Sequence, residues 1–174
     1  SIGVEGEVGM GVRTPAPARR ALIAEAALPL FAAGGYAGTT TDRIATAAGV
    51  SQPYVVRIFG SKVELFLVVL GNAWDEVEGA LAAGVRSGRS LANLGVSEAA
   101  LRVVLHGLLH SATPEIRALS RERLSGVVTA LRSEGTSVVE IRNMLARGVL
   151  QAVVAGICTT SPALPTRGGV TKKP

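Results

Sequence analysis

Apolar residues recur at intervals of three and four along most of this chain, which is the spacing of one face of an α-helix. A wide stripe of this kind covers residues 19–33, and no segment shows the strict apolar–polar alternation of a half-buried strand. Apolar residues make up 48% of the 174, but aromatic residues only 3%, so the core must be built from Ala, Leu, Val and Ile. The sequence therefore predicts an all-α fold that buries a continuous core.

The first third of the chain predicts a cluster of short helices. The stripe at 19–33 contains Pro29, which should kink the helix or loosen one turn, and Gly34 and Gly35 supply the freedom for its end. Two short helices follow, ending near residues 48 and 59, with Gly49 in the turn between them. Their lengths and this turn are typical of a helix-turn-helix.

The remainder predicts longer helices. Ser61 and Glu64 have the spacing of a capping box for a helix at 62–83, and Ser137 and Glu140 form another before a last helix ending near 157. Between them, helices are expected at 97–111 and 114–133, after a Gly- and Ser-rich connection at 84–95. We expect a flexible arm at 1–17, a helix-turn-helix domain at 18–62, a helical regulatory and dimerisation domain at 63–160, and a disordered tail at 161–174.

The net charge of +5 is unevenly distributed. Residues 10–62 hold six basic and two acidic side chains, whereas residues 63–161 hold nine of each. A positive field confined to one part of the molecule indicates a polyanionic partner there.

The chain has features of a cytoplasmic protein. Its single cysteine, Cys158, excludes a disulfide within the chain and fits a reducing compartment. Residues 1–11 lack the charged-then-apolar pattern of a signal peptide. The uncharged stretch at 148–166 contains Pro162 and Pro165, so we expect no membrane span.

Sequence fragments in the first third occur together, in order and at a characteristic spacing. They are Leu30-Phe31, Gly34-Gly35-Tyr36, Thr40-Thr41, Ile44-Ala45, Ala48-Gly49-Val50-Ser51-Gln52-Pro53, Phe59 and Ser61-Lys62. With them, residues 20–70 resemble the DNA-binding domain of the tetracycline-repressor (TetR) family of bacterial transcription regulators. The resemblance implies a repressor that binds a palindromic operator in double-stranded DNA as a homodimer, needs no cofactor and is released by a small apolar effector.

The helix that begins after Ser51 is the expected recognition helix. Its first residues would meet base edges in the major groove, where the Gln52 amide can pair with adenine and Pro53 and Tyr54 can pack on a thymine methyl. Arg57, one turn later, can reach a phosphate or a guanine. The predicted DNA contacts are Thr40, Thr41, Arg43, Ser51, Gln52, Pro53, Tyr54, Arg57 and Lys62.

Simpler roles compete with several of these predictions. Thr40 is a natural N-cap, and Arg43 either contacts DNA or pairs with Asp42, an acid where relatives often have a basic residue. Val56 and Ile58 stand where the family commonly has aromatic or imidazole side chains. Tyr36 is expected in the core. Arg13, Arg19 and Arg20 form a basic arm that either touches DNA or remains solvated.

Small and branched residues on the last two helices predict a dimer interface. Two such helices from each of two chains would form a four-helix contact, unless the same face packs within its own chain. The residues concerned are Leu124, Val127, Val128, Leu131, Leu145, Gly148, Val149 and Ala152.

The resemblance also implies a ligand pocket between the two ends of the molecule. This chain supplies Trp74, Leu101, Leu105, His106, Leu109 and His110 for it. His106 and His110 have a spacing that can chelate zinc, but no Cys, Asp or Glu lies at ligand spacing nearby, so we expect no metal.

Two other classes of function were weighed. An enzyme is not expected, because carboxylates are few and there is neither a phosphate-binding glycine loop nor a histidine beside a plausible nucleophile. A helical interaction protein that binds nucleic acid or acidic partners without sequence specificity is the alternative to a regulator.

Overall fold

The structure is a computed structural model that describes residues 15–87, 95–109 and 112–159. Within these residues it contains seven α-helices and no strand, which confirms the predicted all-α class. The helices are α1 (Ala16–Gly38), α2 (Thr41–Ala47), α3 (Gln52–Phe59), α4 (Lys62–Ser87), α5 (Glu98–Leu109), α6 (Pro114–Ser133) and α7 (Val138–Thr159).

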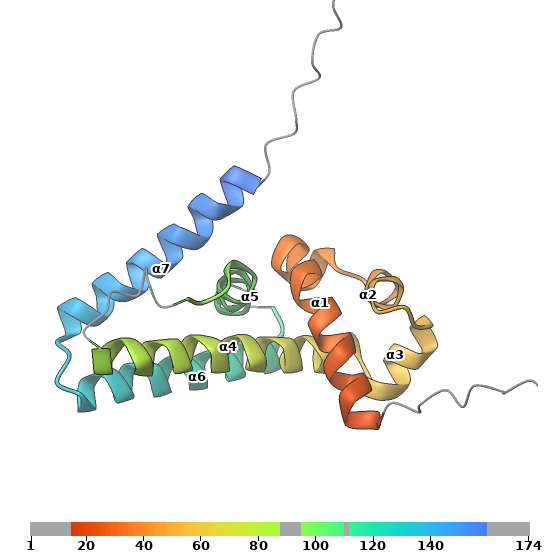
Figure 1. Ribbon diagram of the computed structural model, residues 1–174, viewed down its shortest axis with the longest axis horizontal. Coiled ribbons are helices and arrows are strands. Elements are labelled where there is room, and N and C mark those ends of the chain that lie inside the picture. The colour runs from red at the N-terminus through yellow and green to blue at the C-terminus, as the bar shows by residue number, and fades with distance from the viewer. Residues whose placement is uncertain (1–14, 88–94, 110–111, 160–174) are drawn as a thin grey trace, which may run out of the picture.

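The helices form two groups joined by α4. Helices α1, α2 and α3 gather at one end of the molecule, and the long α4 leads away from them with α6 alongside (Figure 1). Helix α5 packs against both α1 and α4, so it contacts both groups. Helix α7 begins beside the ends of α4 and α6 and extends away from them.

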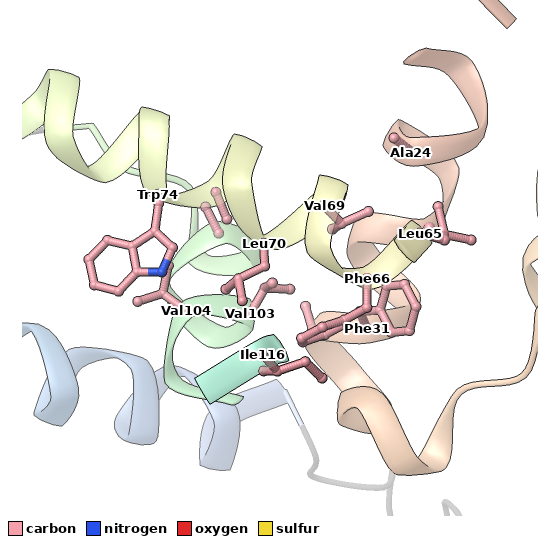
Figure 2. Packing of buried hydrophobic residues seen from close by; sticks show 14 of the residues in the cluster. Ala24, Phe31, Leu65, Phe66, Val69, Leu70, Trp74, Val103, Val104 and Ile116 are labelled. Atoms are coloured by element: carbon pink, nitrogen blue, oxygen red, sulfur yellow. The ribbon is translucent and has the colours of Figure 1, made fainter. Parts of the chain in front are cut away.

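One apolar core runs through both groups. Phe31 of α1 meets Phe66 of α4 edge to face, with ring centroids 4.9 Å apart and an interplanar angle of 83°. Further along α4, Leu70 and Trp74 pack beside Val103 and Val104 of α5 (Figure 2). The same helix α4 therefore supplies core residues to both groups of helices.

The end of α1 differs in part from the prediction. Gly35 has φ 64° and ψ −174°, and it is the residue inside α1 whose backbone angles are not helical, so the break occurs at the glycine pair and not at Pro29. Pro29 is exposed on the outer side of the helix. Its nitrogen has no hydrogen to donate, and water can reach the carbonyl oxygen that is left without this hydrogen bond. The buried Thr39 hydroxyl then lies 2.8 Å from the Gly35 carbonyl oxygen and 3.0 Å from that of Leu30, which caps the broken end.

The N-cap hydroxyl accepts a hydrogen bond at three helix starts, those after Thr40, Ser61 and Ser137. The Thr40 hydroxyl accepts from the Arg43 N–H at 3.2 Å, and Ser137 and Glu140 make a reciprocal capping box. Ser61 accepts from the Glu64 N–H at 3.1 Å, without a return bond from Glu64 among the described contacts. The Ser51 side chain makes no capping hydrogen bond.

Two boundaries change, and some predictions fall outside the description. Helix α4 continues to Ser87, four residues beyond its predicted end and into the expected connection. Residues 1–14 of the arm, the tail at 161–174 and residues 110–111 are not among those described. In the described part of the chain, α1 alone is long and apolar enough by composition to cross a membrane, and its side with Ile23, Ala27 and Phe31 is buried in the core.

Candidate nucleic-acid interface

Helix α3 packs through one side and exposes the other. Val55 and Phe59, four residues apart, are buried, and Ile44 and Ala45 of α2 lie in the same core. Gln52, Pro53 and Arg57 are exposed, and Tyr54 is half-buried. The first turn of α3 therefore faces outward, where the sequence placed a recognition surface.

The starts of α2 and α3 are tied together by side chains. The Gln52 amide nitrogen donates to the Thr41 hydroxyl across the turn at 3.3 Å, so two predicted DNA contacts are neighbours. Arg43 extends back toward α1, with Nη1 3.5 Å from the Gly38 carbonyl oxygen. Among the described residues no ion pair joins Arg43 to Asp42, so the alternative role for Arg43 is not observed.

Arginines surround the outer end of α3. Nη1 of Arg19 lies 3.3 Å from the Tyr54 hydroxyl, and the Arg57 guanidinium lies 4.7 Å from the centre of the same ring. The hydrogen bond from Arg19 and the positive charges of both arginines hold the pKa of Tyr54 below its ordinary value. Arg20, the next residue in α1, donates instead to the Ile58 carbonyl oxygen at 2.7 Å. The sequence did not decide whether Arg19 and Arg20 remain solvated or touch DNA. In the structure both side chains contact α3.

Lys62 has a structural role that the sequence did not reveal. Its ammonium donates to the carbonyl oxygens of Tyr36 and Thr39 at 2.9 and 3.1 Å and lies 4.4 Å from the centre of the Tyr36 ring. Tyr36 in turn packs edge-on against Phe66, as a core role predicts. The predicted phosphate contact of Lys62 remains a prediction, because most of its donors are used within the domain.

The residues predicted to line a ligand pocket do not lie together on one surface, as far as the structure describes them. Trp74 is buried against Val104, and the His106 ring packs against Gly35 with Nε2 3.3 Å from the Ala32 carbonyl oxygen (Figure 2 shows the tryptophan). Leu109 is 80% exposed. Leu101 and Leu105 are half-buried, and His110 lies outside the described residues. Trp74 thus faces the core and His106 the end of α1, whereas Leu109 faces outward.

A cavity exists elsewhere, between α4 and α6. Its volume is about 730 Å³, and its apolar wall includes Leu81, Leu119 and Leu131. Arg123 of α6 lies along it and pairs with Asp75 and Glu78 of α4, at 2.9 and 3.2 Å from Nη1. In the parts of the chain that are described, no group of three His, Cys, Asp or Glu side chains is placed to hold a metal ion.

The predicted dimer face divides between two roles. Val127 and Leu131 are buried within the chain itself, so their prediction as partner contacts is wrong: their side of α6 packs on its own core and on the cavity beside α4. Leu124, Val128 and Leu145 are half-buried against that core, Gly148 is half-buried, and the side chain of Ala152 is not among those described. Val149 is exposed, and its place in a dimer contact remains a prediction.

Three further exposed apolar residues of α7 were missed: Val138, Val139 and Leu150. The signal was present in the sequence, because α7 is apolar on more than one side. The prediction followed only the side with the small residues.

Taken together, two short helices meet across a glycine turn, and the second exposes its first turn beside a cluster of arginines. This geometry defines a helix-turn-helix DNA-binding domain. Residues 23–69 match the family model described as "Bacterial regulatory proteins, tetR family". This segment of the chain therefore matches the DNA-binding domain of the tetR family, as the resemblance implied.

The chain is similar to individual known proteins as follows. Over 76 residues the chain is 41% identical to the HTH-type transcriptional activator FasR of Mycolicibacterium smegmatis, a match that covers 44% of this chain and 33% of FasR. The match thus spans about a third of that relative's length. Among solved structures, a TetR-family regulator from Vibrio parahaemolyticus shares 20% identity, with 84% of this chain and 90% of that chain covered and a TM-score of 0.47. A TetR-family regulator from Streptomyces coelicolor shares 27% identity over 89% of this chain and 87% of its own, with a TM-score of 0.34.

Proposed function

We propose that the protein regulates transcription by binding a palindromic operator as a homodimer, with one α3 in each of two successive major grooves. The observation that carries the proposal is the outward-facing first turn of α3. It presents the Gln52 amide and the exposed Pro53, while the buried Val55 and Phe59 fix the opposite side of the helix in the core. Thr40, Thr41, Arg43 and Ser51 lie at the starts of the same two helices, where backbone N–H groups favour phosphate.

Selection of binding sites from a random DNA pool tests this proposal. We expect enrichment of a two-fold symmetric sequence, and a loss of about 1–3 kcal/mol in discrimination when Gln52→Ala removes the amide that pairs with a base. Arg121→Ala is the matched control, because Arg121 is exposed on α6 and away from α3. Equal affinity for selected and random DNA would overturn the proposal.

A salt titration of DNA binding separates the alternative function. A helical protein that binds nucleic acid or acidic partners only through charge would show a steep salt dependence and no preference among sequences. Binding of that kind, with an unchanged Gln52→Ala variant, would favour the alternative.

We propose that α7 forms the dimer contact. Val138, Val139, Val149 and Leu150 are 45–63% exposed, and the two pairs are eleven residues apart, close to three helical turns. They form an apolar side of α7 that is distinct from the side on which Ile141 is buried in its own chain. A second copy of α7 is the natural cover for such a surface.

Sedimentation measurements test this interface. Val149→Asp and Leu150→Glu should convert a dimer to monomers and weaken operator binding. Arg147→Glu should do neither, since Arg147 is an exposed polar residue of the same helix. A wild-type protein that is monomeric while bound to its operator would contradict the proposal.

We propose that a small apolar effector binds the cavity between α4 and α6. The cavity's apolar wall and volume suit a small ligand, and α4 connects it to α1 and α3. An occupant that favours a different α4–α6 separation would change the distance between the two recognition helices.

A fluorescent apolar dye, anilinonaphthalene sulfonate, probes this cavity directly. Gly126 lines the cavity, and a Cβ added there meets no atom within 4 Å, so we expect Gly126→Phe to be accommodated with its ring in the cavity. We expect the variant to fold and to lose dye fluorescence. Gly79→Ala is the control, because Gly79 also has open space around it and does not line the cavity. Unchanged dye binding in Gly126→Phe would overturn the proposed site.

The sign of regulation is tested by a reporter gene behind the selected operator. The family resemblance predicts a repressor, whereas FasR is named an activator. Reporter expression that falls when the protein is produced supports repression, and expression that rises overturns it.

A further inference from the structure

Two consecutive arginines in the first turns of α1 hold opposite ends of the recognition helix. Arg20 serves the last turn of α3: its Nη1 donates to the Ile58 carbonyl oxygen at 2.7 Å, and its guanidinium lies 4.3 Å from the centre of the Phe59 ring. Helix α3 ends at Phe59, so this carbonyl has no partner within the helix, and a cation is favoured at that end. Arg20 is therefore a positioning residue that holds α3 against α1.

Arg19 serves the first turn of α3, on the side that is exposed. Its Nη1 lies 3.3 Å from the Tyr54 hydroxyl, and its guanidinium carbon lies 5.9 Å from the centre of that ring. Arg57, one turn further along α3, is exposed and lies 4.7 Å from the same ring. Two guanidinium groups from two helices thus converge on one phenol hydroxyl, and all three groups can donate hydrogen bonds.

We propose that Arg19, Tyr54 and Arg57 together bind one phosphate of the DNA backbone, which makes Arg19 a DNA contact supplied by α1. The proposal rests on the proposed function, because α3 must occupy a major groove for this cluster to lie beside the flanking backbone. A phosphate is the matching ligand: it accepts hydrogen bonds only, carries negative charge, and takes paired donors from a guanidinium. The neighbouring Arg20 is excluded from the site because its donors are turned to the Ile58 carbonyl.

The division between the two arginines gives a matched test. Affinity for the selected operator is measured as a function of salt for the wild type, Arg19→Ala and Arg20→Ala, with the thermal unfolding midpoint of each. Complete loss of one phosphate contact lowers the magnitude of the slope of log K against log salt by about 0.9 per subunit, which is about fivefold in affinity per subunit at 0.15 M salt; because Arg57 remains at this phosphate, Arg19→Ala should lower it by a measurable part of that value. We expect this change in Arg19→Ala with an unchanged midpoint, and a lowered midpoint with an unchanged slope in Arg20→Ala.

A charge-conserving variant and a modified operator protect the test from a folding defect. Arg19→Lys should restore the slope. Replacing single phosphates of the operator by neutral methylphosphonates should reveal one position per half-site that weakens the wild type more than it weakens Arg19→Ala, in which only Tyr54 and Arg57 still contact that phosphate. An unchanged slope in Arg19→Ala, while selective DNA binding persists, overturns the phosphate site and leaves the proposed function intact. Absence of selective binding in the wild type overturns the proposed function itself.

Discussion

Replacement of Gly35 by alanine is expected to destabilise the junction between the two groups of helices. Gly35 has φ 64° and ψ −174°, a combination that is almost confined to glycine and costs other residues about 1–3 kcal/mol. An added Cβ would lie 2.9 Å from Nδ1 of His106. That ring is held by the contact of its Nε2 with the Ala32 carbonyl oxygen, so relief of the overlap adds about 1–3 kcal/mol. We expect a total loss of about 2–6 kcal/mol in the free energy of unfolding.

Urea unfolding followed by circular dichroism measures this loss as the shift in midpoint multiplied by the slope. Gly38→Ala is the control, because Gly38 ends the same helix with no atom within 4 Å of an added Cβ. In the double variant of Gly35→Ala with His106→Ala, the stability lost through the overlap should be recovered. The loss due to the backbone conformation of residue 35 should remain. The reasoning is refuted if Gly35→Ala is as stable as Gly38→Ala to within about 0.5 kcal/mol, the usual scatter for a neutral substitution.

Three further substitutions test other contacts of the fold. Gly107→Ala would place a Cβ 2.8 Å from Cδ1 of Leu70, so we expect a loss of about 1–3 kcal/mol in urea unfolding. Lys62→Met removes two hydrogen bonds from an ammonium to carbonyl oxygens and should lower stability by about 2 kcal/mol in the absence of DNA. Glu140→Gln tests pH dependence: hydrogen bonds from Ser137 lower the pKa of the Glu140 carboxyl, so its charged form stabilises the fold above the ordinary value of 4.5. That contribution to stability is lost as the pH falls through the lowered pKa. The thermal unfolding midpoints of wild type and Glu140→Gln should therefore converge below pH 4.5.

The outcomes that contradict these three expectations are distinct. Gly79→Ala, at a helical glycine with open space around it, should not show the loss expected of Gly107→Ala, and equal effects would refute the packing argument. A Lys62→Met protein of unchanged stability but weakened DNA binding would restore the phosphate role predicted from the sequence. A difference between wild type and Glu140→Gln that stays constant from pH 7 to pH 3 would show that ionisation of Glu140 does not stabilise the fold.

The elements that the sequence predicts well depend on neighbours within a few residues. The caps at Thr40 and Ser137 and the break at Gly35 follow from local backbone chemistry, and each has the expected partner or backbone angle in the structure. The spacing of Val55 and Phe59 likewise orients α3, and with it the candidate recognition surface.

The elements that the sequence predicts poorly depend on contacts between distant segments. The apolar stripe of α6 fits a partner's helix or its own core equally well by spacing, and the structure buries Val127 in the core. Trp74 and His106 have the chemistry of pocket residues, but α5 packs against α1 and α4 and encloses them in the structure. The different roles of Arg19 and Arg20 cannot be derived from their order in the chain, because both roles depend on where α3 lies beside α1.

The position of α3 on DNA is the central claim, and site-directed cleavage measures it most directly. An iron chelate attached at Gln52→Cys, in a protein whose Cys158 is replaced by serine, generates hydroxyl radicals that cut the DNA nearest to the first turn of α3. The account predicts two patches of cutting in the selected operator, about 34–36 Å apart, one helical turn or a multiple of it, and little cutting from a chelate at the exposed Ser133 of α6. Uniform cutting along the duplex, or equal cutting from the two positions, would contradict it.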